Sequence, residues 1–265
     1  MTQTILAWSD YSLKDVSNEF ATGAPVRLFV MGDNVWRDEQ EFPLARAVET
    51  SYHLRASSGA NSIRGDGGLE LESPASQKPD SFVYDPGNPV PTIGGRLCCG
   101  NDVIAPGPFD QRPNEGREDV LVYSTPPLEK DVEVTGFITL VLYASTTAAD
   151  TDFTAMLVDV EPTGYARFLT DGMVRARYRE STKKAAPIVP GEIYRYEIDL
   201  WATSNVFKAG HRIRVYVSSS NFPRFNRNPN TGARNMHAEG MVKATQTIYH
   251  DAAHPSALVL PMVPR

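Results

Sequence analysis

Short apolar runs, and stretches in which apolar and polar residues alternate, recur along most of this chain. In residues 212–217, for example, Ile213, Val215 and Val217 occupy every second position. A period of two is typical of a β-strand with one buried face. Because turn residues rather than helical patterns separate the runs, the chain is predicted to be all-β, an antiparallel sandwich or jelly roll. The strands are predicted over residues 26–31, 49–54, 69–72, 81–84, 119–125, 132–145, 153–160, 165–179, 192–201, 212–220 and 257–262.

The stretch from 150 to 179 predicts a β-hairpin at the centre of this fold. Its two runs flank the turn residues Pro162, Thr163 and Gly164. At the end of the second run three arginines alternate with less polar residues, which extends the predicted strand to residue 179. Its polar face, with Arg175, Arg177 and Arg179, is predicted to be solvated or ion-paired.

The N-terminal segment has a different pattern. Residues 3–14 predict one short helix, and residues 15–25 form a polar linker that ends in Gly-Ala-Pro. The apolar run 26–31 predicts a buried strand that begins the sandwich. We therefore divide the chain into a helix and linker (1–25), the remnant of another domain, and a β-sandwich (26–265). Within the sandwich, the proline-rich tract 43–119 is expected to wrap over a rigid scaffold or to lie at an interface.

Composition narrows the function classes. The net charge of −6 over 265 residues argues against nucleic-acid binding, which needs a concentrated basic surface. No apolar run approaches the roughly 20 residues needed to cross a bilayer, and the first residues do not form a signal peptide. The two cysteines, Cys98 and Cys99, are adjacent and cannot link distant segments. We expect them to be small residues on a strand or turn, in a protein of the reducing cytoplasm.

Motifs for catalysis or cofactor binding are missing from the sequence. It contains no G-x-S-x-G nucleophile pattern, and the serines at 218–220 are interpreted as the end of a strand. His250 and His254 are four residues apart, but the following proline argues against a shared helix face and hence against a metal site. His211 is expected to serve a turn or a cap. We therefore predict no catalytic residue, no metal site and no cofactor.

Acidic residues leave one alternative open. Asp150 and Asp152 share one side of an extended segment, and Asp159 ends the following strand. Structural roles are favoured for all three, as acceptors of backbone N–H groups or as partners of arginine. A calcium site, or general acid–base catalysis in a self-contained enzyme, is the alternative interpretation.

Five blocks of sequence also carry a family likeness. Residues 26–44 (VRLFVMGDNVWRDEQEFPL), 85–95 (DPGNPVPTIGG), 110–136, 151–179 and 204–232 resemble, in the same order, the C-terminal part of the cocaine-esterase-like hydrolases. That group includes the X-Pro dipeptidyl-peptidases and the α-amino acid ester hydrolases. Residues 3–15 resemble the end of the family's hydrolase domain. The resemblance implies a jelly roll of the galactose-binding-like type.

The resemblance also implies that chemistry lies elsewhere. In this family the catalytic serine, aspartate and histidine belong to an α/β-hydrolase domain that precedes the first helix, and none has a matching position here. The implied partner is such a hydrolase domain, with this chain helping to wall its substrate cleft. Candidate docking segments are the tract 85–119 and the loops near Asp150 and 221–232. The candidate residues for docking or ligand binding are Asp150, Asp152, Phe153, Asn221, Phe222 and Arg224. A free-standing module that binds carbohydrate or another small ligand is the alternative, and a homo-oligomer stays open.

Overall fold

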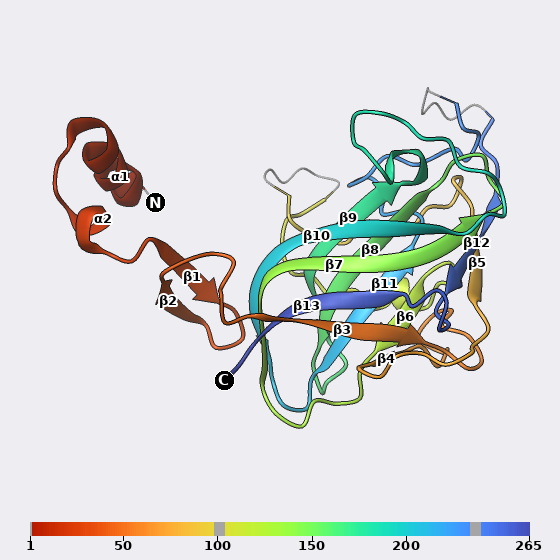
Figure 1. Cartoon of the computed structure of the whole chain (residues 1–265), viewed down its shortest axis with the longest axis horizontal. Helices are drawn as coiled ribbons and strands as arrows, with labels where there is room; N and C mark the ends of the chain where they lie inside the picture. Colours follow the sequence, from red (N-terminus) through yellow and green to blue (C-terminus); the bar gives the residue numbers. More distant parts are fainter. Residues whose placement is uncertain (1, 98–103, 234–239) are drawn as a thin grey trace.

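A β-sandwich forms most of the molecule, and a slender N-terminal arm projects from one side of it (Figure 1). The computed structural model describes residues 2–97, 104–233 and 240–265. Cys98 and Cys99 lie outside these ranges, so the prediction for them stays a prediction. The helices are α1 (Thr2–Lys14), α2 (Glu19–Thr22) and α3 (Arg112–Glu115), with a 3-10 turn η1 (Ala176–Tyr178). The strands are β1 (Val26–Val30), β2 (Val35–Glu39), β3 (Val48–Arg55), β4 (Gly68–Glu70), β5 (Asp80–Tyr84), β6 (Leu121–Ser124), β7 (Val132–Thr146), β8 (Asp152–Val160), β9 (Ala166–Arg175), β10 (Tyr194–Phe207), β11 (Arg212–Ser218), β12 (Ala244–Tyr249) and β13 (Ala257–Val263).

The long strand β7 is the centre of one layer. Along one edge it pairs with β10, and along the other it pairs with β13 and then with β12. Strands β3 and β5 extend this layer beyond β13 and β12. The second layer runs β6-β11-β8-β9, and the short strand β4 joins the two layers. Apart from the β4–β6 contact, the strand pairs of these layers are antiparallel, which confirms the predicted all-β antiparallel sandwich.

The main core lies between the two layers. Leu140 and Ile198 come from the first layer, Leu157 and Val215 from the second, and all four are fully buried. Burying each such side chain stabilises the fold by about 1.5–3 kcal/mol relative to leaving it exposed. The alternating residues seen in the sequence therefore supply the contacts that hold the layers together.

A second apolar cluster covers the outer face of β8. Every residue of β8 is buried; Leu157 points to the main core, whereas Met156 and Val158 belong to the second cluster. Val90, from the proline-rich tract 43–119, and Val120, which directly follows it, pack on that outer face. In its described part the tract thus wraps over the scaffold, as predicted, and β8 is covered on both sides.

Strand β12 was not predicted, because a polar residue occupies one of its inward positions. Ala244, Gln246 and Ile248 are buried, and the intervening residues are more exposed. The Gln246 side chain donates a hydrogen bond from Nε2 to Oγ1 of Thr151 at 2.8 Å. Since this bond satisfies its buried amide nitrogen, a glutamine can stand where the pattern calls for an apolar residue.

The strand predicted to reach residue 179 ends four residues earlier, at Arg175. The backbone N–H of Ala176 donates to the carbonyl of Thr151, and that of Arg177 donates to Oδ1 of Asp150 at 3.0 Å. These bonds draw the chain out of the ladder and into η1. The alternation of arginines in this segment therefore reflects ion pairing around a turn and not a strand face.

The N-terminal arm (residues 2–39) is built on α1, α2 and the hairpin β1–β2. The helix predicted over 3–14 is confirmed as α1, which contacts α2 through the rings of Trp8 and Phe20, 5.4 Å apart. The run 26–31 was predicted to be a buried strand; the strand is confirmed, but its burial is not. It forms β1, which pairs with the unpredicted β2 in a sheet of its own, and of its residues only Val30 is buried.

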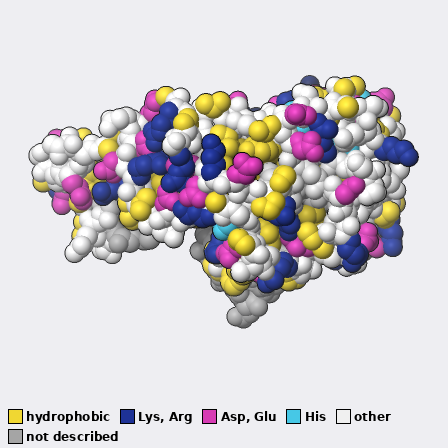
Figure 2. Space-filling model, turned by 90° about the horizontal axis from the view of Figure 1, so that it is seen from below, with side chains coloured by type: hydrophobic (Ala, Val, Ile, Leu, Met, Phe, Trp, Pro, Cys, Tyr) yellow, Lys and Arg dark blue, Asp and Glu magenta, His cyan; other side chains and the backbone are white. Residues whose placement is uncertain are grey.

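Charged side chains fix the arm to the sandwich. Arg37 donates from Nη1 and Nη2 to the two carboxylate oxygens of Glu133, at 2.9 and 2.6 Å, and from Nε to Glu39 at 2.6 Å. Arg46 also pairs with Glu39. Next to them, the backbone of Met31 exchanges hydrogen bonds with β10. In Figure 2, basic and acidic side chains intermingle where the narrow N-terminal part meets the sandwich.

Acid is expected to loosen the arm before the sandwich unfolds. The hydrogen bond from Arg46 lowers the pKa of Glu39, and Lys208 lowers that of Asp33. Burial acts against the lowering at Glu133, but the hydrogen bonds from Arg37 and Thr135 outweigh it, and its pKa is lowered as well. A carboxylate with a lowered folded-state pKa stabilises the fold above its unfolded pKa, and this contribution is lost as the pH falls through the folded value. The protection of residues 26–39 against hydrogen exchange, corrected for the intrinsic rate at each pH, should therefore stay high at pH 5–7 and fall below about pH 4.

The variant Arg37→Met removes the ion pairs of Arg37 at neutral pH and can be compared with the effect of acid on the unmodified chain. It should show fast exchange in residues 26–39 already at pH 7, with the exchange of β7 and β8 unchanged. If acid accelerated exchange in the arm and in the sandwich at the same pH, these ion pairs would not be what holds the arm.

Candidate functional site

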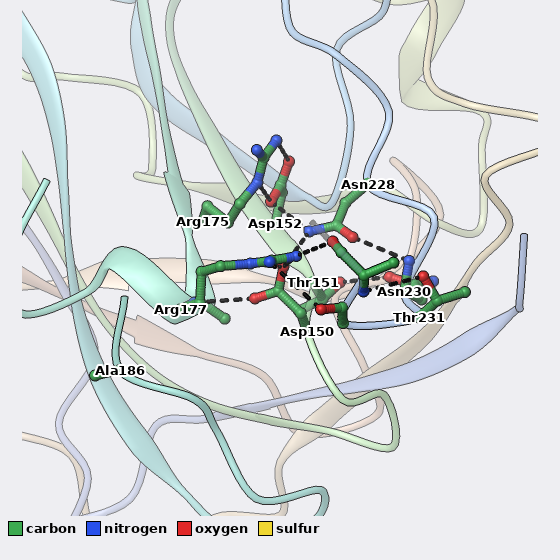
Figure 3. A network of polar contacts seen from close by, with 12 residues as sticks. Asp150, Thr151, Asp152, Arg175, Arg177, Ala186, Asn228, Asn230 and Thr231 are labelled. Atoms are coloured by element: carbon green, nitrogen blue, oxygen red, sulfur yellow. Dashed lines mark hydrogen bonds and ion pairs between the residues drawn. The ribbon is translucent and has the colours of Figure 1, made fainter. Parts of the chain in front are cut away.

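The loop that follows β11, residues 219–233, is held by carboxylates at the start of β8 (Figure 3). Arg175 donates to both oxygens of Asp152, from Nε at 2.8 Å and from Nη2 at 3.0 Å. Arg177 pairs with Asp150 through Nε at 2.8 Å. Asn228, from the loop, donates from Nδ2 to both carboxylates, at 2.9 Å to Asp150 and 2.8 Å to Asp152. One loop amide thereby joins two ion pairs.

Neighbouring contacts extend this network along the loop. Oγ1 of Thr151 donates to Oδ1 of Asn230 at 3.0 Å. Nη1 and Nη2 of Arg177 reach the carbonyls of Gly232 and Ala233, at 3.4 and 2.9 Å. The loop is therefore fixed from Asn228 to Ala233 by side chains of β8 and of the segment after β9.

A third buried carboxylate, Asp171 on β9, holds the other end of the loop. Its Oδ2 accepts from Nε of Arg224 at 2.7 Å and from Nδ2 of Asn221 at 3.1 Å. Arg96, from the irregular tract, donates to the carbonyl of Asp171 at 2.6 Å. Phe222 bonds to the backbone of the same tract, through Val90 and Thr92. Asp171 thus ties two segments that are far apart in the sequence to one strand.

The ion pairs of Asp150 and Asp152 indicate that these two carboxylates have a structural role. Burial raises the pKa of Asp152, an effect that the Arg175 guanidinium opposes, and the hydrogen bond to Asp152 raises the pKa of Arg175. A buried ion pair contributes little net stability, yet removing one partner is costly because the other charge is left unpaired. The oxygens of Asp150 and Asp152 are occupied by arginine and asparagine donors, so neither group is free to transfer a proton to a substrate.

The hypothesis of an acid–base pair formed by Asp152 and Asp159 fails on distance. Asp152 and Asp159 are seven residues apart on β8, which corresponds to about 23 Å at 3.3 Å per residue, and an odd separation puts them on opposite faces. Two carboxyl groups that act on one glycosidic bond are about 5–10 Å apart. Asp152 and Asp159 therefore do not act on one substrate bond as a pair.

A surface of arginines stacked on aromatic rings covers this end of the molecule. The guanidinium of Arg227 lies 4.9 Å from the Phe222 ring centre, and that of Arg224 lies 5.2 Å from Phe225. Arg96 lies 5.9 Å from the ring of the exposed Trp201. We call these six residues, with Arg96 and Trp201 included, the arginine–aromatic surface. Trp201 adopts a left-handed φ of 68° where the β7–β10 register shifts, a conformation that is strained for a bulky side chain.

The residues predicted for docking divide into two groups. Asp150, Asp152 and Phe153 are 1, 1 and 0% exposed, so their side chains cannot contact a partner, and Asn221 is buried as well. For these four the prediction of a docking surface is corrected: they hold the loop from inside. Phe222 and Arg224 reach the arginine–aromatic surface. Sequence reasoning included Arg96 only as part of the candidate docking tract 85–119, and it missed Trp201, whose exposure beside a β-bulge only the structure shows.

Two of the histidines, His250 and His254, are part of the scaffold. His250 is buried and bonds to Asp80 and Gln77, and His254 caps a turn with Asp251. Among the residues that the structure describes, no group of three or more His, Cys, Asp and Glu side chains is arranged to hold a metal ion. In the same part of the chain, no helix is long and apolar enough to cross a membrane.

A cavity of about 510 Å³ lies between the tip of the β1–β2 hairpin, the irregular tract and strands β8 to β10. His211 lines it, and its Nδ1 is 2.8 Å from Oδ1 of Asp159. Burial raises the pKa of Asp159, while hydrogen bonding to His211 opposes the rise. His211 was expected to serve a turn or a cap. Its side chain is instead a partner of Asp159 at the wall of a cavity large enough for a small molecule.

Comparisons with known proteins agree on one relationship. Residues 18–259 match the family model described as "X-Pro dipeptidyl-peptidase C-terminal non-catalytic domain". The chain is 47% identical over 262 residues to a cocaine esterase of Rhodococcus sp. (strain MB1 Bresler), a match that covers 98% of this chain and 45% of that protein. It also superposes on the crystal structure of an aminopeptidase from a marine sediment Thaumarchaeota archaeon, with a TM-score of 0.84 and 29% identity over 99% of this chain and 44% of that one. An α-amino acid ester hydrolase gives a TM-score of 0.82 and 28% identity over 97% and 44%. The chain thus spans less than half the length of these relatives.

Proposed function

Because this chain belongs to the family of X-Pro dipeptidyl-peptidase C-terminal non-catalytic domains, we propose that it packs on the α/β-hydrolase domain of a serine hydrolase. In this role it forms part of the wall of the substrate cleft, and the hydrolase domain supplies the serine, aspartate and histidine. The chain contributes to the shape of the substrate cleft and to contacts with the hydrolase domain, but it does not contribute the nucleophile. The partner is the other half of the same enzyme.

The exposed apolar side of the N-terminal arm is the observation that carries this proposal. No residue of α1 is buried, although Ile5, Leu6, Trp8 and Leu13 are all apolar and 53–81% exposed. An isolated helix of this length is marginal in water and is usually stabilised by packing of its apolar face. An exposed apolar surface of this kind indicates an interaction site. A hydrolase domain adjoining α1 would cover these side chains.

Two further features support the same arrangement. The charged contacts between Arg37 and Glu133 hold the arm rigidly enough to orient a docked domain. The arginine–aromatic surface has the composition of protein–protein hot spots, in which tryptophan and arginine are enriched. We propose that residues 1–25 belong structurally to the hydrolase domain, with the β1–β2 hairpin connecting them to the sandwich. Phe222 and Arg224 are proposed as contacts at the far side of the interface.

Reconstitution in trans tests the proposal. The chain is mixed with the separately produced remainder of the Rhodococcus cocaine esterase, and the complex is followed by light scattering and by hydrolysis of p-nitrophenyl acetate. We expect a 1:1 complex with a higher rate than the hydrolase part alone, and loss of the complex for the double variant Trp8→Asp, Leu13→Asp. The control Leu71→Asp changes an equally exposed residue outside the arm and should leave the complex intact. Serine-dependent ester hydrolysis by this chain alone would contradict the proposal.

The two remaining interpretations from the sequence have simple tests. A carbohydrate-binding module should respond to a panel of sugars through the fluorescence of Trp8, Trp36 or Trp201. A homo-oligomer should appear by light scattering of the chain without its partner.

A further inference from the structure

The cavity beside His211 presents one hydrogen-bond acceptor. Asp159 is 4% exposed, and as a carboxylate it can only accept, so Nδ1 of His211 donates to it across 2.8 Å. The neutral imidazole then carries its lone pair on Nε2. The His211 side chain is partly exposed and lines the cavity.

The same cavity presents one hydrogen-bond donor. Asn205 lines it and is 2% exposed, and within the described ranges its Nδ2 has no hydrogen-bond partner. The amide also faces Asp159, and as a donor it opposes the rise that burial causes in the pKa of that carboxyl. Because the nitrogen carries two N–H groups, one is available to a ligand even if the other faces Asp159. A buried donor without an acceptor destabilises the protein, so an acceptor placed here would be bound favourably.

Charge in the cavity favours a neutral ligand. Three cations line it, and each is already paired: Arg167 with Glu161, Lys208 with Asp33 and Asp131, and Arg96 with Asp171. A carboxylate ligand would have to compete with these partners. The remaining walls include the apolar side chains of Met31, Phe168, Leu169 and Val206.

We propose that this cavity binds the carboxamide group of a neutral small molecule with an apolar body. The ligand's carbonyl oxygen accepts from Nδ2 of Asn205, and its N–H donates to Nε2 of His211. Met31, Phe168 and Leu169 contact the apolar body. All the residues named for this site belong to this chain, and Arg96, which also lines the cavity, is shared with the arginine–aromatic surface.

Three matched probes test this site on the chain: hexanamide, N,N-dimethylhexanamide and hexanoate. Binding is followed through the ring resonances of His211 by NMR. Hexanamide should give saturable shifts, and the other two should bind at least about ten-fold more weakly, because one lacks the N–H and the other is charged and lacks it too. Equal binding of the three, absence of saturation with hexanamide, or shifts confined to other residues would overturn the proposal.

A variant adds a second readout. Asn205→Ala should weaken hexanamide binding about ten-fold, while Asn88→Ala, which changes an exposed asparagine outside the cavity, should leave it unchanged. Should Asn205→Ala fail to fold, the comparison of the three probes on the unmodified chain decides the question. Unchanged affinity in a folded Asn205→Ala variant would contradict the assignment.

Discussion

Replacing Asp80 by alanine is expected to lower the free energy of unfolding by about 3–5 kcal/mol, because it removes one partner from a buried charged network. Oδ2 of Asp80 accepts from the hydroxyl of Tyr123 at 2.7 Å and lies 2.9 Å from Nε2 of His250. Oδ1 accepts from the backbone N–H of Ala60 at 3.1 Å. The carboxylate therefore joins β5, β6 and the end of β12.

The partners cannot be satisfied in another way. His250 and Tyr123 are 1 and 0% exposed. Burial raises the pKa of Tyr123 well above its usual value, so its hydroxyl is a neutral donor that needs an acceptor. The other ring nitrogen of His250 lies 3.1 Å from Oε1 of Gln77, an oxygen that also accepts from the N–H of Ala56. Both ring nitrogens thus face acceptors, and removal of the Asp80 carboxylate would leave Nε2 without its partner.

Urea unfolding followed by circular dichroism measures this effect as a shift of the midpoint at constant slope. The control Glu197→Ala removes one partner of an exposed pair with Arg195 and should cost less than about 1 kcal/mol. Tyr123→Phe should show an intermediate loss and a strong coupling with Asp80→Ala in a double-mutant cycle. A loss below about 1 kcal/mol for Asp80→Ala would mean that the network can rearrange around the gap.

Much of the fold could be predicted from the sequence because its core obeys a simple period. In β11 the residues at every second position, Ile213, Val215 and Val217, are fully buried. The pattern failed where a polar side chain faces inward, as Gln246 does in β12, and where a carboxylate ends a strand, as Asp150 does beyond Arg175. In both cases the deciding partner is distant in sequence, and a local pattern cannot contain it.

The candidate site was predicted only in part, again because some of its contacts join residues that are distant in the sequence. An aspartate at a strand end paired with arginine is a local expectation, and Asp150 and Asp152 meet it. The loop amide that joins them, Asn228, lies 76 residues from Asp152 and was not predicted. The pairing of Asp159 with His211 spans 52 residues. Contacts between strands and loops that are far apart in the sequence therefore decide which polar residues are buried and which reach the surface.

Replacing Asp150 by alanine is expected to loosen the 219–233 loop as well as to destabilise the sandwich by about 3–5 kcal/mol. The change removes the carboxylate that accepts three hydrogen bonds. The donors are the backbone N–H of Arg177, the guanidinium of Arg177 and the side-chain amide of Asn228. The Arg177 side chain is 13% exposed and would be left without its carboxylate. Its hold on the carbonyls of Gly232 and Ala233 would weaken with it.

Hydrogen exchange distinguishes the local loosening of the 219–233 loop from the loss of stability of the whole sandwich. In Asp150→Ala, amides of residues 228–233 should exchange at least about ten-fold faster than the global loss of stability explains, because local opening adds to global unfolding. Asp38→Ala, which breaks an exposed pair with Arg27, should change neither quantity appreciably. If exchange rose equally in β7, β8 and the loop, the carboxylate would stabilise the sandwich as a whole. The arginine–aromatic surface that rests on this loop would then be held by Asp171 instead, and Asp171→Ala would be the variant that disturbs docking.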